Sequence, residues 1–444
     1  MMRCADFNTR PSSSSLSLKA DELYEAARAV ASGIPLGRMR RKWGDSKTFH
    51  PEMEPLVMTA SDRPPSRRSA VAPFIAMDVM SAAFDRIAKG ERIIRMEIGE
   101  PGASAPKAVL DAARAALDDG RIGYTEALGS RALRQRIAQY YADRHGVDVP
   151  PSRIAITTGS SAGFNLAFLA AFDPGDRVAI ASPGYPAYRN ILAALGLEVV
   201  EIETSADTRH AITPAMLERV HAETPLAGIL VASPGNPTGT MMTPEALAAL
   251  VRATDELGIR FISDEIYHGL VYDGVAETAL KTSDRAIIIN SFSKYYCMTG
   301  WRIGWMVLPE GLVRPVERIA QSLYISAPDL SQRAAIAAFD ATEELEIIKA
   351  GYAANRRLLL EKLPKIGFDD YFPVDGAFYI YASVRRFSND SADFAQKMLA
   401  EAGISATPGA DFDRVHGHAH IRFSFAGATA EMAEAAERLE RWLA

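Results

Sequence analysis

The chain has 444 residues, of which 48% are hydrophobic and 23% charged, and its formal net charge is −6 at pH 7. The length exceeds what a single hydrophobic core usually holds, so we expect a large domain and a smaller one. The acidic balance argues against a nucleic-acid partner, and no apolar run reaches the roughly 20 residues of a membrane helix. Two cysteines, Cys4 and Cys297, cannot build a disulfide framework and favour a reducing, cytoplasmic environment.

Residues 1–69 differ in composition from the rest of the chain. They contain the runs SSSSLSL, RMRRKWGD and RPPSRRS, with one helix-like stretch at 21–31. Acidic residues such as Asp6 and Asp21 interrupt the pattern of a transit peptide, and no secretory signal is present. We therefore predict a flexible N-terminal extension, or an upstream start codon before a natural beginning near Met58.

The segment EIGEPGASAP at 97–106 ends a predicted strand and turns sharply. Its glycines and prolines suit a backbone that approaches a ligand closely. A helix is predicted at 109–117, and the following GYTEALGSRALRQRIAQYY places a turn, which contains Tyr124, before another helix.

From Ile154 the pattern of strand, turn and helix repeats, which is typical of a parallel sheet with crossover helices. The first strand leads into GSSAGFNLAFLAAF, in which Ser160, Ser161 and Ala162 open a helix. Free backbone amides and the positive end of the helix dipole favour a phosphate at such a position. Ligands of parallel sheets also bind at the carboxyl ends of strands, where this turn lies.

The pentapeptide GSSAG also fits the GxSxG nucleophile elbow of serine hydrolases. In that alternative Ser161 would act with a later acid and one of His416, His418 or His420. No HGGG-like oxyanion loop precedes it, and such a run of small residues arises readily by chance, so the hydrolase is a remote alternative.

Three later strands are followed by candidate ligand-binding side chains. Tyr185 follows RVAIAS, Asn236 lies in SPGNPTG, and Asp264 ends IRFISD. An ionised carboxylate at the end of a buried strand is costly unless a cation faces it, so Asp264 predicts a cationic ligand group. A metal shared with Glu265 is not expected, because adjacent strand residues face opposite ways.

Lys294 lies in NSFSKYYCMTGWRIGW, directly after the β-branched run AIII. Desolvation lowers the pKa of an ammonium group, and a partly neutral lysine can form an imine with an aldehyde. The hydroxyl of Ser291 and the guanidinium of Arg302 suit a phosphate group. Together these residues predict a covalent anchor beside an anion clamp.

One long helical pattern is predicted from Glu310 to Glu344, followed by a smaller unit with strands in VDGAFYIYASV and HAHIRFSFA. Arg422 lies within the second of these strands. An arginine inside a strand needs an anion, and a bidentate grip on a carboxylate is the natural one. HGHAH lacks an accompanying acid or cysteine cluster, so no metal is predicted.

The segment around Lys294 resembles the Schiff-base lysine signature of class I aminotransferases of fold type I, which use pyridoxal 5′-phosphate. The resemblance covers roughly 97–443. It implies an α/β fold with a mostly parallel, helix-flanked sheet in a large domain at 106–325. A smaller α+β domain would be built from 70–105 and 326–444.

The resemblance also implies residue roles. Lys294 would form the Schiff base and act as general base and acid, while Gly99, Asn236 and Arg422 would bind the substrate. Gly102 and Ala103 replace the aspartate and aromatic of the family's GEPDF segment. The implied cofactor contacts are Ser160, Ser161, Ala162, Ser291 and Arg302 at the phosphate, Tyr185 on the ring, Asn236 and Tyr267 at the phenolic oxygen, Asp264 at the ring nitrogen, and Tyr124 at the partner subunit's cofactor phosphate.

The implied function is ping-pong transfer of an amino group between an L-amino acid and a 2-oxo acid by a homodimer, with no metal, nucleic-acid or membrane partner. A pyridoxal-phosphate-dependent C–S or β-elimination lyase of the same fold stays open as an alternative. The amino donor is not readable from the sequence. Ser161 supplies no extra cation for a dicarboxylic substrate, which favours neutral or aromatic donors.

Overall fold

The computed structural model describes residues 65–444, which form one compact unit. The predicted flexible extension lies outside the described residues up to position 64, as does its helix-like stretch at 21–31. The described part begins with a short 3-10 turn, η2 (Arg67–Ser69), and the helix α2 (Ile75–Ala88). None of the described helices is both long and apolar enough to cross a membrane.

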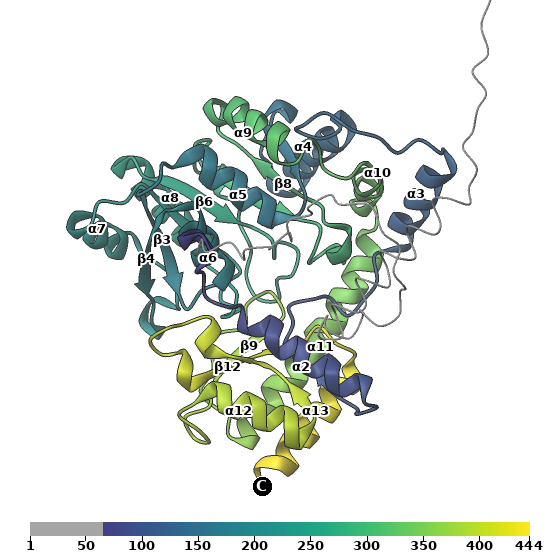
Figure 1. Cartoon of the computed structure of the whole chain (residues 1–444), viewed down its shortest axis with the longest axis vertical. Helices are drawn as coiled ribbons and strands as arrows, with labels where there is room; N and C mark the ends of the chain where they lie inside the picture. Colours follow the sequence, from purple (N-terminus) through teal and green to yellow (C-terminus); the bar gives the residue numbers. More distant parts are fainter. Residues whose placement is uncertain (1–64) are drawn as a thin grey trace, which may run out of the picture. The chain divides into compact units, whose positions relative to one another are not determined.

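A seven-stranded sheet with the order β2-β8-β7-β6-β5-β3-β4 lies at the centre of the larger part of the fold (Figure 1). The pairs among β3 to β7 are parallel, and only β8 runs antiparallel to its neighbours β2 and β7. This confirms the predicted mostly parallel α/β sheet. The strands are β2 (Ile154–Thr157), β3 (Arg177–Ser182), β4 (Glu198–Glu203), β5 (Gly228–Ala232), β6 (Arg260–Asp264), β7 (Ile287–Ser291) and β8 (Gly304–Val307).

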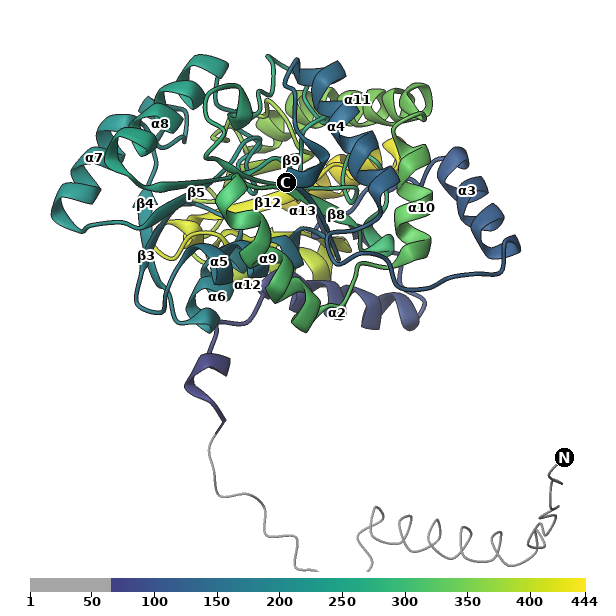
Figure 2. The ribbon, with the colours of Figure 1, turned by 90° about the horizontal axis from the view of Figure 1, so that it is seen from above.

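Helices cover both faces of this sheet, and alternate strand residues divide the core between them (Figure 2). In β7, for example, Ile288 packs into a cluster with residues of α4, α8 and α10, whereas Ile287 and Ile289 pack into a second cluster with α5, α6 and α9. The period of two follows from the strand geometry. The helices of this part are α3 (Lys107–Asp118), α4 (Arg131–His145), α5 (Ser160–Ala171), α6 (Pro186–Leu195), α7 (Pro214–Glu223), α8 (Pro244–Leu257), α9 (Glu310–Leu323) and α10 (Asp329–Ala338).

The prediction of one long helical pattern from Glu310 to Glu344 is wrong. The chain forms α9, then α10, and then begins α11 (Thr342–Ile366). The first break occurs because Ile325 adopts a positive φ of 63° and Pro328 precedes α10, where its ring disfavours helical backbone at the residue before it.

Two smaller sheets contain strands from both ends of the described chain. β9 (Tyr379–Ser383), β12 (His420–Ser424) and β11 (Thr407–Pro408) form an antiparallel sheet, and β1 (Ile94–Arg95) pairs in parallel with β10 (Ile404–Ser405). Helices α12 (Ser391–Lys397) and α13 (Thr429–Leu443) follow β9 and β12 in the chain. This is the smaller α+β unit that the resemblance implies; the boundaries at 105/106 and 325/326 remain a prediction.

Candidate active site

A cavity of about 270 Å³ opens at the carboxyl ends of the parallel strands and is bordered by residues of β9 and β12. Most of the residues predicted from the sequence line it, although they come from elements that are far apart in the chain. These are Gly99, Ser160, Ser161, Tyr185, Asn236, Asp264, Tyr267, Lys294, Arg302 and Arg422.

Lys294 follows β7 and extends its ammonium group into this cavity, where Nζ donates a hydrogen bond to the carbonyl oxygen of Gly99. Burial lowers the pKa of Lys294 from 10.5 to about 8; the Glu100 carboxylate opposes this shift, while Arg422 adds to it. A substantial fraction of the amine is therefore neutral near physiological pH, as a nucleophile requires.

One end of the cavity is built to hold an anion. The guanidinium of Arg302 packs against Gly159, the residue before α5, so closely that a Cβ on Gly159 would lie 2.5 Å from Arg302 Nη2. Gly159 also has a positive φ of 77°, which an L side chain rarely adopts. Because Ser160 and Ser161 open α5 here, the cation faces free backbone amides at the positive end of the helix.

Two predicted phosphate residues are not among those that line the cavity. Ser291 is fully buried, and its hydroxyl donates to the Ile303 carbonyl at 3.1 Å and lies 2.9 Å from Ser293 Oγ. Ser293 lines the cavity in its place, because the strand ends at Ser291 and the turn carries the later serine to the opening. Ala162 is buried within α5.

Asp264 forms the floor of the cavity at the end of β6. Its Oδ1 accepts a hydrogen bond from the Ile266 amide at 3.1 Å, and its Oδ2 accepts one from the Tyr188 hydroxyl. Tyr188 also lines the cavity, so the carboxylate is oriented by a neighbour within the site. Burial raises the pKa of Asp264 to about 6, against the hydrogen bond from Tyr188. Among the described residues, no cation lies within salt-bridge distance of this carboxylate.

Arg422 is a buried cation without an acidic partner among the described residues. The residue is 3% exposed. Its Nη1 donates a hydrogen bond to Asn236 Oδ1 at 2.8 Å, and its Nη2 donates one to the Glu97 carbonyl oxygen at 2.5 Å. Its Nε has no hydrogen-bond partner. The guanidinium also lies 4.4 Å from the Tyr379 ring centroid. A buried guanidinium held only by neutral groups fits an anionic ligand.

Several side chains in the cavity were not found from the sequence. Tyr379 in β9 contacts the Tyr267 hydroxyl, with 2.7 Å between the two oxygens. Phe74 packs edge-on against Tyr185, with 5.7 Å between ring centroids. The others are Ala76, Met77, Ile98, Glu100, Phe164, Tyr188, Ile266, Ser293 and Thr299. The aromatic pattern of FYIY marks Tyr379 as a strand residue but gives no sign of the strand with which it pairs.

Tyr124 does not line the cavity of its own chain and is 83% exposed. It lies in the turn before α4, where Gly123 N donates to Asp329 Oδ2 and Thr125 N to Ser326 Oγ. The structure therefore places it on the surface beside the segment between α9 and α10.

Neither a hydrolase triad nor a metal site is present in the part of the chain that the structure describes. No histidine lines the cavity, so the histidine that a Ser161 triad requires is absent from it. Within residues 65–444, no group of three or more His, Cys, Asp or Glu side chains has a geometry that holds a metal ion.

Comparisons with known proteins give one consistent result. The family model for aminotransferase class I and II matches residues 91–439. A valine–pyruvate aminotransferase of Mycobacterium tuberculosis is 50% identical over 85% of this chain and 97% of its own length. The crystal structure of an aminotransferase from the same organism matches with a TM-score of 0.84 and 50% identity, over 86% of this chain and 99% of that one. The Thermus thermophilus aspartate aminotransferase with maleate matches with a TM-score of 0.80 and 32% identity, over 85% and 99%.

Proposed function

Because this chain belongs to the class I and II aminotransferase family and is an aminotransferase, we propose that it transfers the amino group of a neutral, apolar L-amino acid to a small 2-oxo acid such as pyruvate. The charge of the cavity carries this proposal. Its cations are Lys294, Arg302 and Arg422, and the other charged side chains that line it, Glu100 and Asp264, are acidic. With these three cations assigned to the anchor, the phosphate and the α-carboxylate, no further cation among residues 65–444 lines the cavity for a second substrate carboxylate.

The rim of the cavity adds a positive argument for an apolar substrate. Phe74, Met77 and Ile98 present apolar surface there. Glu100 is held nearby by the Thr299 hydroxyl, which donates to Glu100 Oε1 at 2.6 Å. A carboxylate at this point repels a dicarboxylic side chain, whereas a branched aliphatic one gains from contact with the rim.

The donor preference is tested by steady-state kinetics with pyruvate as acceptor. We expect kcat/KM for L-valine to exceed that for L-aspartate by about tenfold or more, which corresponds to about 1.4 kcal/mol of discrimination. Glu100→Gln removes the repelling charge and should narrow the ratio by improving L-aspartate, whereas Glu91→Gln, a surface change, should leave the ratio unaltered. A wild-type preference for L-aspartate would refute the proposed donor class.

The cavity fits pyridoxal 5′-phosphate, on which this family depends. Arg302 and the amides at the start of α5 would bind the phosphate, and Asp264 would hold the proton on the ring nitrogen. Asn236 Oδ1 is occupied by Arg422, so its amide nitrogen is the group left to donate to the phenolic oxygen, together with the Tyr267 hydroxyl. When bound, the cofactor supplies an aldehyde that captures amines and a ring that accepts electrons from the α-carbon.

Lys294 and Arg422 would then have different roles towards the substrate: proton transfer and carboxylate binding. Arg422 would bind the α-carboxylate and orient the α-carbon, because its Nε is free and its other nitrogens are fixed by Asn236 and Glu97. Lys294 Nζ would remove the α-proton and later return it, which needs an amine with a pKa near the working pH. Retention of the carboxylate by Arg422 favours transfer over decarboxylation.

The lowered pKa of Lys294 predicts a pH dependence in the cofactor-free protein. Since only the neutral amine attacks an aldehyde, reductive methylation of Lys294 by formaldehyde and cyanoborohydride should speed up about tenfold per pH unit and level off near pH 8. Exposed Lys107 serves as the internal reference, measured by mass spectrometry of the same digests. A rate at Lys294 that still rises tenfold per pH unit above pH 9 would contradict a lowered pKa.

We further propose that the enzyme is a cytoplasmic homodimer. Tyr124 lies with exposed Ile122 beside exposed Ile325, and the two segments are joined through Ser326 and Asp329. Exposed apolar side chains gathered at one place support an interface between copies. The scarcity of cysteine supports the location.

The homodimer is tested by sedimentation at micromolar concentration. We expect the wild-type chain to sediment as a dimer, and the double substitution Ile122→Asp and Ile325→Asp to raise the dimer dissociation constant at least about 100-fold, because each buries a charge at the interface. Val415→Asp, an equally exposed apolar position elsewhere, is the matched control. A wild-type monomer would exclude the dimer.

A further inference from the structure

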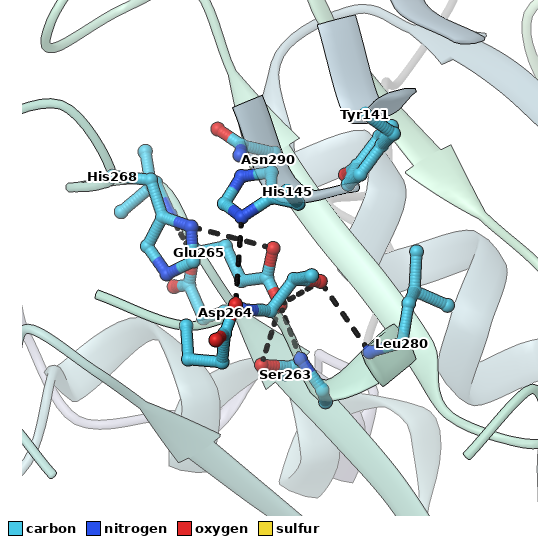
Figure 3. Close-up of polar contacts among 12 residues, drawn as sticks. Tyr141, His145, Ser263, Asp264, Glu265, His268, Leu280 and Asn290 are labelled. Carbon is cyan, nitrogen blue, oxygen red and sulfur yellow. Dashed lines mark hydrogen bonds and ion pairs between the residues drawn. The ribbon is translucent and has the colours of Figure 1, made fainter. Parts of the chain in front are cut away.

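A group of buried polar side chains lies behind the active-site wall. Asp264 lines the cavity, but the next residue, Glu265, does not, and it is 1% exposed. Figure 3 shows Glu265 among Ser263, His268 and His145. A carboxyl group so deeply buried needs a partner for each of its oxygens.

Only one carboxyl oxygen of Glu265 has donors. Oε1 accepts hydrogen bonds from Ser263 Oγ at 3.2 Å, from Thr278 Oγ1 at 3.0 Å and from the Ala279 amide at 3.1 Å. Oε2 accepts none. The first oxygen is therefore saturated as an acceptor, and any proton on this carboxyl group belongs on Oε2.

The unpartnered oxygen faces an unpartnered nitrogen. His268 Nδ1 lies 3.5 Å from Glu265 Oε2, and neither atom has a hydrogen-bond partner. The His268 amide also donates to the Glu265 carbonyl at 2.9 Å, which holds the two side chains beside each other. A proton on Oε2 would satisfy both unpartnered atoms at once, because Oε1 already has three donors and a neutral imidazole has one acceptor nitrogen.

The electrostatics agree with this arrangement. Burial raises the pKa of Glu265 from 4.5 to about 8, and burial lowers the pKa of His268 to about 3, so both groups are neutral at pH 7. The titratable and charged groups that face the pair are Asp264 in β6, Tyr140, Tyr141, Arg144 and His145 in α4, and Glu277 and Lys281 around η5 (Ala279–Lys281).

We propose that Glu265 and His268 form a neutral acid–imidazole pair in which Glu265 Oε2 carries the proton and donates it towards His268 Nδ1, and that this pair positions the cofactor wall. It adjoins two cavity residues in the chain. Glu265 follows Asp264, and His268 follows Tyr267. Both residues are thus positioning residues for the proposed cofactor contacts, and this inference rests on the function proposed above.

The protonation state is tested by thermal melting of the full chain from pH 5 to pH 9, with and without pyridoxal 5′-phosphate. The folded wild type keeps a proton that the unfolded chain loses above about pH 4.5, so its stability should fall as pH rises to about 8 and then level off. Glu265→Gln keeps a neutral donor and cannot ionise. The difference between the melting temperatures of Glu265→Gln and the wild type should therefore increase from pH 5 to pH 8 in favour of the variant. Above pH 8 the difference should stay constant.

A constant difference across this range, or one that shrinks as pH rises, would overturn the proposal, because Glu265 would then be ionised throughout. This result does not depend on cofactor uptake. It therefore separates failure of the pair from failure of the proposed function, which would appear as a wild-type chain that does not bind pyridoxal 5′-phosphate.

The positioning role is tested by equilibrium dialysis with pyridoxal 5′-phosphate at pH 7. Glu265→Ala leaves three hydrogen-bond donors and His268 Nδ1 unpaired, so we expect its Kd for pyridoxal 5′-phosphate to rise about tenfold or more. The Kd of Glu265→Gln should stay within about threefold of the wild-type value. His268→Ala is the second variant, should Glu265→Ala not fold. Leu439→Ala, a buried truncation in α13, controls for general destabilisation. Wild-type affinity in the folded alanine variants, or an equal loss in Leu439→Ala, would refute the role.

Discussion

Replacement of Lys294 by alanine is expected to abolish transamination, with a fall in kcat/KM of at least about 10⁴-fold. Two functions are lost together, because the same amine anchors the aldehyde and moves the α-proton. No described residue can substitute: the other cations that line the cavity are Arg302 and Arg422, and a guanidinium group does not form an imine with an aldehyde.

The anchor itself can be measured apart from turnover. After incubation with pyridoxal 5′-phosphate and borohydride, digestion and mass spectrometry should find the cofactor mass on the peptide that contains Lys294, and no label in Lys294→Ala. Lys107→Ala, an exposed lysine on α3, should label and turn over as the wild type does. Turnover within tenfold of the wild type in Lys294→Ala would require a different catalytic base.

Replacement of Arg422 by leucine is expected to raise KM for the amino acid and to lower kcat/KM by about 10²-fold or more. The charge-assisted contacts to a carboxylate are lost, and such buried contacts are worth about 2–5 kcal/mol when one partner is truncated. Arg422→Lys keeps the charge but not the planar fork, so we expect an intermediate loss.

The same substitution should not destabilise the ligand-free fold by a comparable amount. Arg422 is a desolvated cation without a carboxylate partner among the described residues, and removal of such a charge releases its desolvation cost. Melting of the ligand-free protein, run beside the kinetics, checks this. If kcat/KM of Arg422→Leu stays within threefold of the wild-type value with L-valine or with L-aspartate, the α-carboxylate binds elsewhere.

The strand ends could be predicted from the sequence because hydrophobic runs locate them without knowledge of the tertiary fold. Asp264, Asn236 and Tyr185 each follow such a run, and parallel topology brings those ends to one edge. The choice between Ser291 and Ser293 was different. Which hydroxyl reaches the cavity depends on where β7 ends and on the Ile303 carbonyl, which accepts a hydrogen bond from Ser291. Neither feature can be predicted from the sequence alone.

Residues that reach the site from distant segments of the chain also could not be predicted from the sequence. Phe74 and Met77 come from the start of α2, which is held by the carboxylate of Asp411, since the amides of Ile75 and Ala76 both donate to it at 3.1 Å. Tyr379 arrives through its register against Ser424 in β12. Amphipathic patterns reveal that such segments are structured, but not which cavity they border.

The pairing of β1 with β10 has a consequence for synthesis of the protein. Ile94 is translated about 300 residues before its partner Ile404 and before Arg422. Such long-range closure is slow and costs chain entropy before it gains contacts. A nascent chain can thus complete the central sheet and Lys294 while Arg422, the residue proposed to bind the α-carboxylate, is still untranslated, so we expect turnover of amino acids only after the smaller unit has been made.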